Sequence, residues 1–212
     1  MVPKKVIGKF GEGRVCNILE KIVEQYGGEV FRNAYIPIGG KRTVEIDVLF
    51  LCKRGLFVFE VKTLAGEVVG SLRLNEWTVK GKDKKFKLYN PIKQNGQHVN
   101  AVARFLGVSR SYCKNVVVFS TNAELKKVPA NTKEHTIVKI GELEEFLPRR
   151  MRWQRECFDE MELDRLRELL QKAVKSTVED RKAHAVDARI AAWKRVRKRE
   201  REKARRRSKG IE

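Results

Sequence analysis

Apolar residues recur along this chain with two different periods. Between Val15 and Val23 they are spaced three and four apart, which predicts a helix with Glu12 in its first turn and its end at Gly27 and Gly28. Several other runs are continuously apolar and are bounded by turn residues, as is typical of strands. The predicted strands are 29–38, 43–51, 56–64, 66–80 with 84–89, 114–120 and 135–140, and further helices are expected at 141–147 and 156–174.

The second long helix has clear signals at both ends. Asn90 suits the N-cap, Pro91 the first helical position, and Gly107 the position just after the last turn. Gln94 and His98 are four residues apart, so they share a face of this helix, and we expect that face to point toward the 44–62 hairpin.

The sequence changes character after residue 148. The short helix is expected to end at Pro148, and the chain beyond residue 174 has few large apolar side chains and ends in a run of Arg, Lys and Glu. We therefore predict an α/β core over residues 1–148, in which a mixed β-sheet is flanked by helices. A basic α-helical extension over residues 149–212 is expected to follow and to fray into a tail.

Charged residues interrupt the two apolar strands of the 44–62 hairpin. If positions 53 and 54 form the turn, paired positions across the hairpin sum to 107. Asp47 then lies opposite Glu60, and Glu45 opposite Lys62, with all four side chains on one face. Two carboxylates held so close repel each other, so one should take up a proton unless a cation neutralises the pair.

This grouping matches the needs of phosphodiester hydrolysis, which are a metal ion, an activated water and stabilisation of the leaving oxygen. Asp47 and Glu60 supply hard oxygen ligands that suit Mg²⁺ or Mn²⁺, and the backbone carbonyl of Val61 is a candidate further ligand. Lys62 is expected to orient or help deprotonate the water and to stabilise negative charge. A Glu-x-Lys sequence usually means a surface ion pair, but its apolar neighbours here favour a metal site.

The formal net charge of +20 favours a phosphate polymer as partner, and a charged surface that serves solubility is the alternative. Residues 181–212 hold fourteen Lys and Arg against four Asp and Glu, a net of +10, so the other 180 residues carry the remaining +10. Nucleic-acid contacts are therefore expected from the loop after Trp77 and from the tail. The candidates are Lys82, Lys84, Lys85, Arg197, Lys198, Arg199, Arg205, Arg206 and Arg207.

Other features argue against several classes of protein. The chain has no apolar run of about 18 residues, so no membrane span or membrane partner is expected. No apolar region follows the basic N-terminus, so no secretory signal is expected. The four cysteines are widely spaced, which favours reduced thiols in a cytoplasmic protein. The glycines at positions 8–13 lack the Gly-Lys-Ser/Thr of a phosphate-binding P-loop.

Asp47 followed by Glu60-Val61-Lys62 resembles the PD-(D/E)xK nuclease superfamily, and the chain more closely resembles the nuclease-related domain (NERD) family. One difference is that Ile46, rather than proline, precedes Asp47. The matching segments are 8–12, 43–47, 55–62 with Gly66, Trp77, 90–95 and 138–147, which together span about residues 6–148.

The resemblance implies a restriction-endonuclease-like core and Mg²⁺-dependent cleavage of DNA. It assigns Asp47 and Glu60 as metal-binding acids and Lys62 as the catalytic lysine. Glu12 then matches the acid of the first helix, and Gln94 matches the helix glutamine that often completes such sites. Residues 149–212 are not covered by the resemblance.

The leading hypothesis from the sequence is a metal-dependent DNA endonuclease whose basic extension grips the backbone. The alternatives are a structure-specific nuclease of the Holliday-junction type, a non-catalytic nucleic-acid-binding protein, and an RNA-associated factor. Because duplex cutting usually uses two active sites, the sequence is also compatible with a homodimer formed through residues 156–174.

Overall fold

The computed structural model describes residues 4–40 and 42–174 of the chain. Its helices are α1 (Lys4–Tyr26), α2 (Pro91–Leu106), α3 (Leu143–Arg152) and α4 (Glu160–Val174), with short 3₁₀ turns at Arg110–Tyr112 and Ile140–Glu142. Its strands are β1 (Glu29–Pro37), β2 (Thr43–Cys52), β3 (Gly55–Lys62), β4 (Gly66–Val69), β5 (Glu76–Lys80), β6 (Lys85–Tyr89), β7 (Cys113–Phe119), β8 (Ala123–Lys127) and β9 (His135–Lys139).

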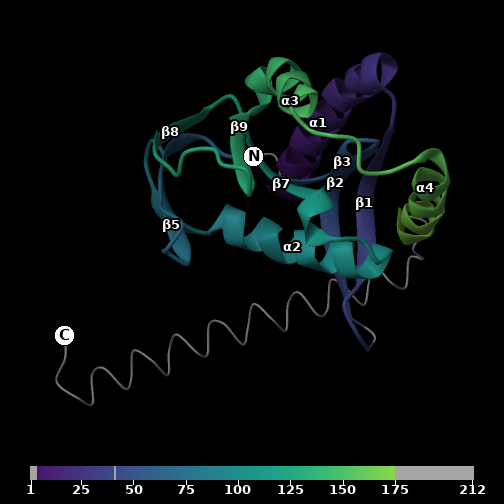
Figure 1. The fold of residues 1–212 in the computed structure, drawn as a ribbon. Coiled ribbons are helices and arrows are strands. Elements are labelled where there is room, and N and C mark those ends of the chain that lie inside the picture. The colour runs from purple at the N-terminus through teal and green to yellow at the C-terminus, as the bar shows by residue number, and fades with distance from the viewer. Residues whose placement is uncertain (1–3, 41, 175–212) are drawn as a thin grey trace.

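The strands form two mixed sheets, which confirms the predicted α/β class (Figure 1). The larger sheet has the order β1-β2-β3-β7-β9, in which β1, β2 and β3 are antiparallel neighbours and β3, β7 and β9 run parallel. The smaller sheet has the order β6-β5-β4-β8 and pairs β4 with β8 in parallel. The parallel pairs need long crossovers, and α2 supplies the one between β3 and β7.

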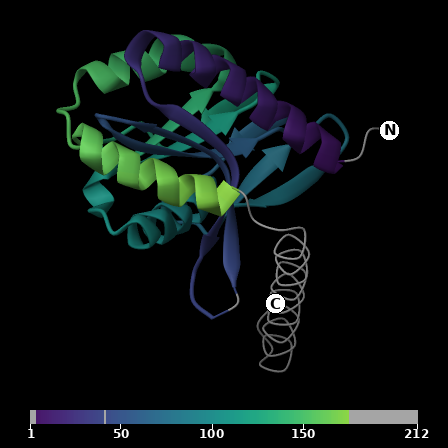
Figure 2. The same ribbon diagram turned by 90° about the vertical axis from the view of Figure 1, so that its right-hand side faces the viewer.

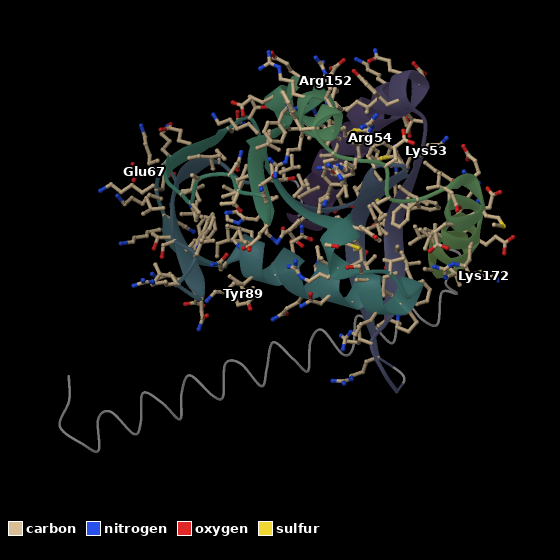
Figure 3. All side chains as sticks on the ribbon, viewed as in Figure 1. Lys53, Arg54, Glu67, Tyr89, Arg152 and Lys172 are labelled. Carbon is tan, nitrogen blue, oxygen red and sulfur yellow. The ribbon has the colours of Figure 1, made fainter. Side chains whose placement is uncertain are left out.

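The β2–β3 hairpin has the predicted register. Its ladder runs from Cys52–Gly55 to Val48–Phe59, and each pair sums to 107. The turn contacts the connection between α3 and α4, because the carbonyl of Lys53 accepts the N–H of Cys157 and Arg54 donates to the carbonyl of Gln154 (Figure 3). The closed end of the hairpin is therefore fixed to this connection, and Glu45, Asp47, Glu60 and Lys62 lie toward the other end.

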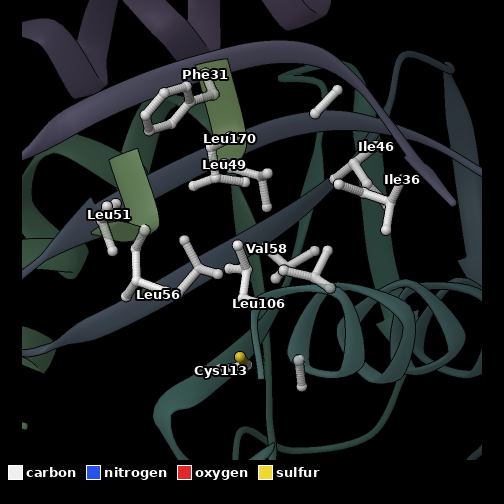
Figure 4. Close-up of a cluster of buried hydrophobic side chains, with 14 of the residues drawn as sticks. Phe31, Ile36, Ile46, Leu49, Leu51, Leu56, Val58, Leu106, Cys113 and Leu170 are labelled. Atoms are coloured by element: carbon white, nitrogen blue, oxygen red, sulfur yellow. The ribbon is translucent and has the colours of Figure 1, made fainter. Parts of the chain in front are cut away.

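The larger sheet is a central layer with helices on both faces (Figures 1 and 2). Alternate side chains of β3 explain this arrangement, since Leu56 and Val58 pack with α2 and α4 whereas Phe57 and Phe59 pack with α1 and α3. Figure 4 shows the first of these clusters, with Leu106 and Leu170 closing over the strands. A third cluster around Trp77 joins the smaller sheet to β7 and β9, so the ring of Trp77 is part of the core.

The predicted alternation of β2 is interrupted at Asp47. Ile46 packs with α2 and α4, but Val48 packs with α1 and α3, so two residues of equal parity lie on opposite faces. Asn33 on the neighbouring strand has a φ of 50°, and the β1–β2 pairing passes from Arg32–Val48 to Ala34–Ile46 without it. The expectation that Glu45, Asp47, Glu60 and Lys62 share one face by simple alternation is therefore wrong, because the strand twists at this point.

Helix α2 begins and ends as its sequence predicts. The Asn90 side chain accepts hydrogen bonds from the N–H groups of Ile92 and Lys93, and Pro91 occupies the first helical position. Gly107 ends the helix with a left-handed φ of 68°. The Asn90 amide also donates to the carbonyls of Ser71 and Leu74, which fixes the start of the helix against the smaller sheet.

Four expectations about the elements differ from the structure. The predicted strand 66–80 forms two strands, β4 and β5, with residues 70–75 between them. Helix α1 begins at Lys4, so Glu12 lies in the middle of this helix and not in its first turn. Helix α3 runs through Pro148 to Arg152, because the burial of Leu147 and Met151 on either side holds the helix together. Strand β8 was not predicted, since its short polar sequence pairs only with the distant β4.

Helix α4 packs on β1 and β2 and belongs to the same hydrophobic cluster as α2. Its Leu166 and Leu170 are fully buried, and burial of each contributes about 1.5–3 kcal/mol. The apolar side of α4 is thus used within the chain, whereas the division at residue 148 and the homodimer stay predictions. All four cysteines are free, and no helix among residues 4–40 and 42–174 is long and apolar enough to cross a membrane.

Candidate active site

Glu60 is a buried carboxylate near the end of β3, with a relative exposure of 3%. Its Oε1 accepts hydrogen bonds from Lys62 and from Nε2 of Gln94 (2.8 Å), and its Oε2 lies 3.3 Å from Nδ1 of His98. Burial alone would raise the pKa of Glu60, but His98 and the Lys62 ammonium outweigh it and hold the pKa below its usual value. Glu60 is therefore ionised at neutral pH.

Asp47 reaches the same place from β2 by way of a backbone contact. Its Oδ2 accepts the N–H of Val61 at 2.8 Å, beyond the last regular pair of the β2–β3 ladder. Burial and the charge of Glu60 raise the pKa of Asp47 well above its usual value, and Glu12 raises it further, against the Val61 N–H and Lys62. The two carboxylates therefore repel each other, which favours a proton on Asp47 rather than on Glu60 where no cation is bound.

Helix α1 brings Glu12 to this cluster through a close approach at Gly11. A Cβ at position 11 would lie 2.1 Å from Oγ1 of Thr63 and 3.3 Å from Cγ1 of Val61, so only glycine lets the helix come so near to β3. Glu12 follows directly, and its negative charge acts on Asp47. The motif residue Gly11 thus serves to place the acid beside it.

Helix α2 is fixed to the sheet by a buried amide. The Nδ2 of Asn95 donates to the carbonyl of Val58 and to Oδ1 of Asn115 (each 2.8 Å), and Asn115 in turn donates to the carbonyl of Ile92. Gln94 directly precedes Asn95. The hydrogen bonds of Asn95 therefore fix the rotation of α2 about its axis, and this rotation directs Gln94 toward Glu60. The predicted orientation of Gln94 toward the hairpin is confirmed.

Lys62 completes the group from the same strand as Glu60. Its Nζ donates to Glu60 and lies 3.2 Å from Oε1 of Gln94, and its side chain is 16% exposed. The structure therefore gathers Glu12, Asp47, Glu60, Lys62 and Gln94 from two strands and two helices. The ladder does not pair Glu45 with Lys62, since Glu45 pairs with Tyr35 of β1 instead.

The family model described as the nuclease-related domain, NERD, matches residues 7–120, more than half of the chain. The chain belongs to the NERD family.

Relatives of this NERD protein include an uncharacterised protein of Bacillus anthracis, pXO1-01, which is 28% identical over 137 residues. The match covers 65% of this chain and 64% of the relative, so the chain spans slightly less than two thirds of that protein.

Two solved structures are similar in shape. Can2 from Sulfobacillus thermosulfidooxidans, solved with cyclic tetra-adenylate, is 18% identical with a TM-score of 0.41 over 68% of this chain and 36% of its own. AF1548, a protein of unknown function, is 13% identical with a TM-score of 0.38 over 87% and 97% of the two chains.

The donor set of the NERD site fits a divalent cation bound in part by water. Among the residues that the structure describes, no three His, Cys, Asp or Glu side chains are gathered as a metal cage. Mg²⁺, however, usually takes one or two carboxylates and keeps several waters. Oε2 of Glu60 is buried, with Nδ1 of His98 at 3.3 Å but no well-aligned hydrogen bond from a described residue, and Asp47 carries the electrostatic repulsion that a cation would relieve.

The remaining predicted residues lie elsewhere or outside the described residues. Lys82 and Lys84 are exposed on the turn between β5 and β6, and Lys85 begins β6. The tail candidates Arg197, Lys198, Arg199, Arg205, Arg206 and Arg207 lie outside the residues that the structure describes. Nucleic-acid binding by both groups stays a prediction.

Two residues of the site were not assigned a role from the sequence. His98 was placed on the face of Gln94, but nothing local indicated its contact with Glu60, which lies 38 positions earlier in the chain. Asn95 belongs to the 90–95 motif and lies among the apolar residues of α2. A polar side chain at such a position indicates a buried hydrogen bond, and the structure shows that Asn95 is buried.

Proposed function

We propose that this NERD protein is a metal-dependent endonuclease that hydrolyses phosphodiester bonds of DNA, with RNA as a further substrate to test. The observation that carries the proposal is the pair Asp47 and Glu60. Glu60 is buried and ionised, and burial and the Glu60 charge raise the pKa of the nearby Asp47. The two carboxyl groups thus oppose each other's ionisation, and Mg²⁺ or Mn²⁺ bound between them would relieve this repulsion.

Each residue then has a distinct role. Asp47 and Glu60 would hold the cation, with the Val61 carbonyl as a candidate additional ligand. A cation bound there supplies charge neutralisation and a bound water of lowered pKa. Lys62, kept in place by Glu60 and Gln94, stabilises negative charge on the phosphate and its leaving oxygen. His98 is a positioning residue, since it contacts Oε2 of Glu60.

The test is cleavage of supercoiled and linear DNA by the full chain with Mg²⁺ or Mn²⁺, and with EDTA as the blank. Asp47→Asn and Lys62→Met should each lower the rate at least about a hundredfold, the range of a lost electrostatic group. Lys80→Met is the matched control, because Lys80 forms an exposed pair with Glu67 at 3.1 Å on the smaller sheet. Equal rates for the wild type and both site variants would refute the proposal. Comparison of a four-way junction with a linear duplex separates a general endonuclease from a junction-specific one.

A non-catalytic nucleic-acid-binding module is the second candidate. It is favoured by the way Lys62, Gln94 and His98 already surround Glu60, and by the absence of a group of three ligating side chains within residues 4–40 and 42–174. Salt-sensitive binding without metal-dependent cleavage of any DNA or RNA substrate would select this candidate.

A further inference from the structure

A polar groove opens beside the candidate active site, between α2 and the tip of the β1–β2 hairpin. It has a volume of about 560 Å³, and its polar lining comprises Arg42, Tyr89, Gln94, Gln97, His98 and Arg104. None of its lining residues is Asp or Glu. The groove is therefore positively charged, although it lies directly next to the carboxylates of Asp47 and Glu60.

Helix α2 connects the groove to the site. Gln94 and His98 contact Glu60 and also line the groove. Farther along the same helix face lies Arg104, ten residues and about 15 Å from Gln94 at 1.5 Å per residue. A strand whose scissile phosphate lies beside the Asp47 and Glu60 site could thus place its next phosphates along this face.

The two arginines that line the groove are available to bind an anion. Arg42 on the hairpin and Arg104 on α2 are exposed, and neither side chain forms a hydrogen bond or ion pair within the described part of the chain. Several other arginines of the fold are paired with acids, as Arg32 is with Glu20 at 2.9 Å and Arg167 with Glu29 at 2.8 Å. Guanidinium groups bind phosphate with two parallel hydrogen bonds, so unpaired arginines on both walls suit a nucleic-acid backbone.

The groove also has an aromatic side chain and a limited size. Tyr89 lies at its edge with 36% relative exposure, and Nε2 of Gln97 lies 3.5 Å from the Tyr89 hydroxyl. Aromatic rings bind unpaired bases by stacking on their faces. In a duplex those faces are already covered by the neighbouring bases. A volume of about 560 Å³ falls within the roughly 300–1,000 Å³ of small-ligand sites, so the groove is large enough for a nucleotide or two.

We infer that this groove binds unpaired nucleotides adjacent to the phosphodiester that is cut, with Arg42 and Arg104 on the phosphates and Tyr89 against a base. The inference deepens the proposed function and rests on it for the place of the scissile phosphate. It assigns the protein a preference for strands with a single-stranded segment beside the cleavage point.

Binding of a fluorescent single-stranded oligonucleotide by the full chain, measured in EDTA over a range of salt, tests this inference without any cleavage. Arg42→Gln/Arg104→Gln should reduce the slope of log K against log salt by about 1.4, which is about 0.7 for each lost phosphate contact. Tyr89→Leu should weaken single-strand binding about tenfold, and Tyr89→Phe should retain it. Binding of a blunt duplex should change much less in the Tyr89 variants.

The matched control is Arg152→Gln/Arg155→Gln, which removes two exposed arginines from α3 and the loop after it. Figure 3 shows Arg152 on the opposite side of the sheet from Tyr89. This control should leave the single-strand slope nearly as in the wild type. An unchanged slope in the Arg42 and Arg104 variant, absent single-strand binding by the wild type, or equal losses on single strand and duplex would each overturn the inference. These binding measurements are made in EDTA and require no cleavage. They therefore test the groove even if the protein proves not to be a nuclease.

Discussion

The carboxylate of Asp47 accepts the backbone N–H of Val61 at 2.8 Å, one residue beyond Glu60. This contact replaces the next rung of the β2–β3 ladder, which ends at Val48–Phe59. It brings a second carboxylate to Glu60 from a strand that twists at this position. The hydrogen bond stabilises Asp47 in its place, while burial and the Glu60 charge disfavour its ionisation.

Asp47→Asn should stabilise the protein when no metal is bound. The folded pKa of Asp47 is raised, so its contribution to stability is present below the unfolded value of about 3.9 and is lost as pH rises through the folded pKa. The amide keeps an acceptor for the Val61 N–H and has no charge to bury. At about pH 8 we therefore expect a higher free energy of unfolding for Asp47→Asn than for the wild type, and a smaller difference toward pH 5.

Urea denaturation in EDTA from about pH 5 to pH 8 measures this difference. Asp47→Ala is the comparison, because it leaves the Val61 N–H without its partner and should lose about 1–3 kcal/mol relative to Asp47→Asn. A variant Asp47→Asn that is less stable than the wild type at every pH would show that the charge is not penalised.

Gly11→Ala should damage the site, and Gly13→Ala should not. A Cβ at Gly11 would overlap Oγ1 of Thr63 at 2.1 Å, whereas nothing lies within 4 Å of a Cβ at Gly13. We expect Gly11→Ala to lower the free energy of unfolding by about 1–3 kcal/mol and to lower cleavage by displacing Glu12. Gly13→Ala should instead stabilise helix α1 by about 0.5–1 kcal/mol. Thermal denaturation of both variants decides the matter, and equal effects would rule out the close approach.

Asn95→Ala should loosen α2 from the sheet. The buried Asn95 amide donates to Val58 and Asn115, and its loss leaves buried acceptors without a partner. We expect the free energy of unfolding to fall by about 2–3 kcal/mol. We also expect slower cleavage, because Gln94 and His98 lie on this helix. The exposed Asn100, which accepts from Arg110 at 2.8 Å, is the control, and Asn100→Ala should cost less than about 1 kcal/mol. Similar losses for the two asparagines would contradict the role of Asn95.

Local signals predicted much of this fold. The caps of α2 at Asn90 and Gly107 and the hairpin register were predictable, because each depends on residues near one another in sequence. The missed features depend on distant partners. Strand β8 exists because Ala123 pairs with Gly66, and α3 continues through Pro148 because of tertiary burial. The irregular pairing at Asn33, which redirects Asp47, likewise has no local sequence signature.

His135 should make the protein less stable in mild acid. It is buried at 5% exposure, with Nδ1 3.1 Å from Oγ1 of Thr132 and Nε2 without a partner among the described residues. Burial lowers the pKa of His135, against a hydrogen bond with Ala130 and the charge of Glu134. The unfolded chain therefore binds this proton at a higher pH than the folded chain, and stability is lost as pH falls below about 6.5.

His135→Gln removes this titration. The free-energy advantage of the wild type over His135→Gln should shrink as pH falls from about 7.5 to about 5.5, with all other histidines common to both proteins. Paired urea titrations at each pH measure the advantage. An advantage that stays constant or grows toward acid would be incompatible with a lowered pKa at His135.

The most direct test of the metal site is a crystal of the full chain soaked in Mn²⁺ and examined by anomalous scattering. We predict one strong peak bonded to oxygens of both Asp47 and Glu60, at the roughly 2.0–2.2 Å typical of small hard divalent cations and carboxylates. The same soak of Asp47→Asn should lack that peak. A wild-type crystal with no peak at these two carboxylates, under conditions in which Mn²⁺ supports cleavage, would contradict the site.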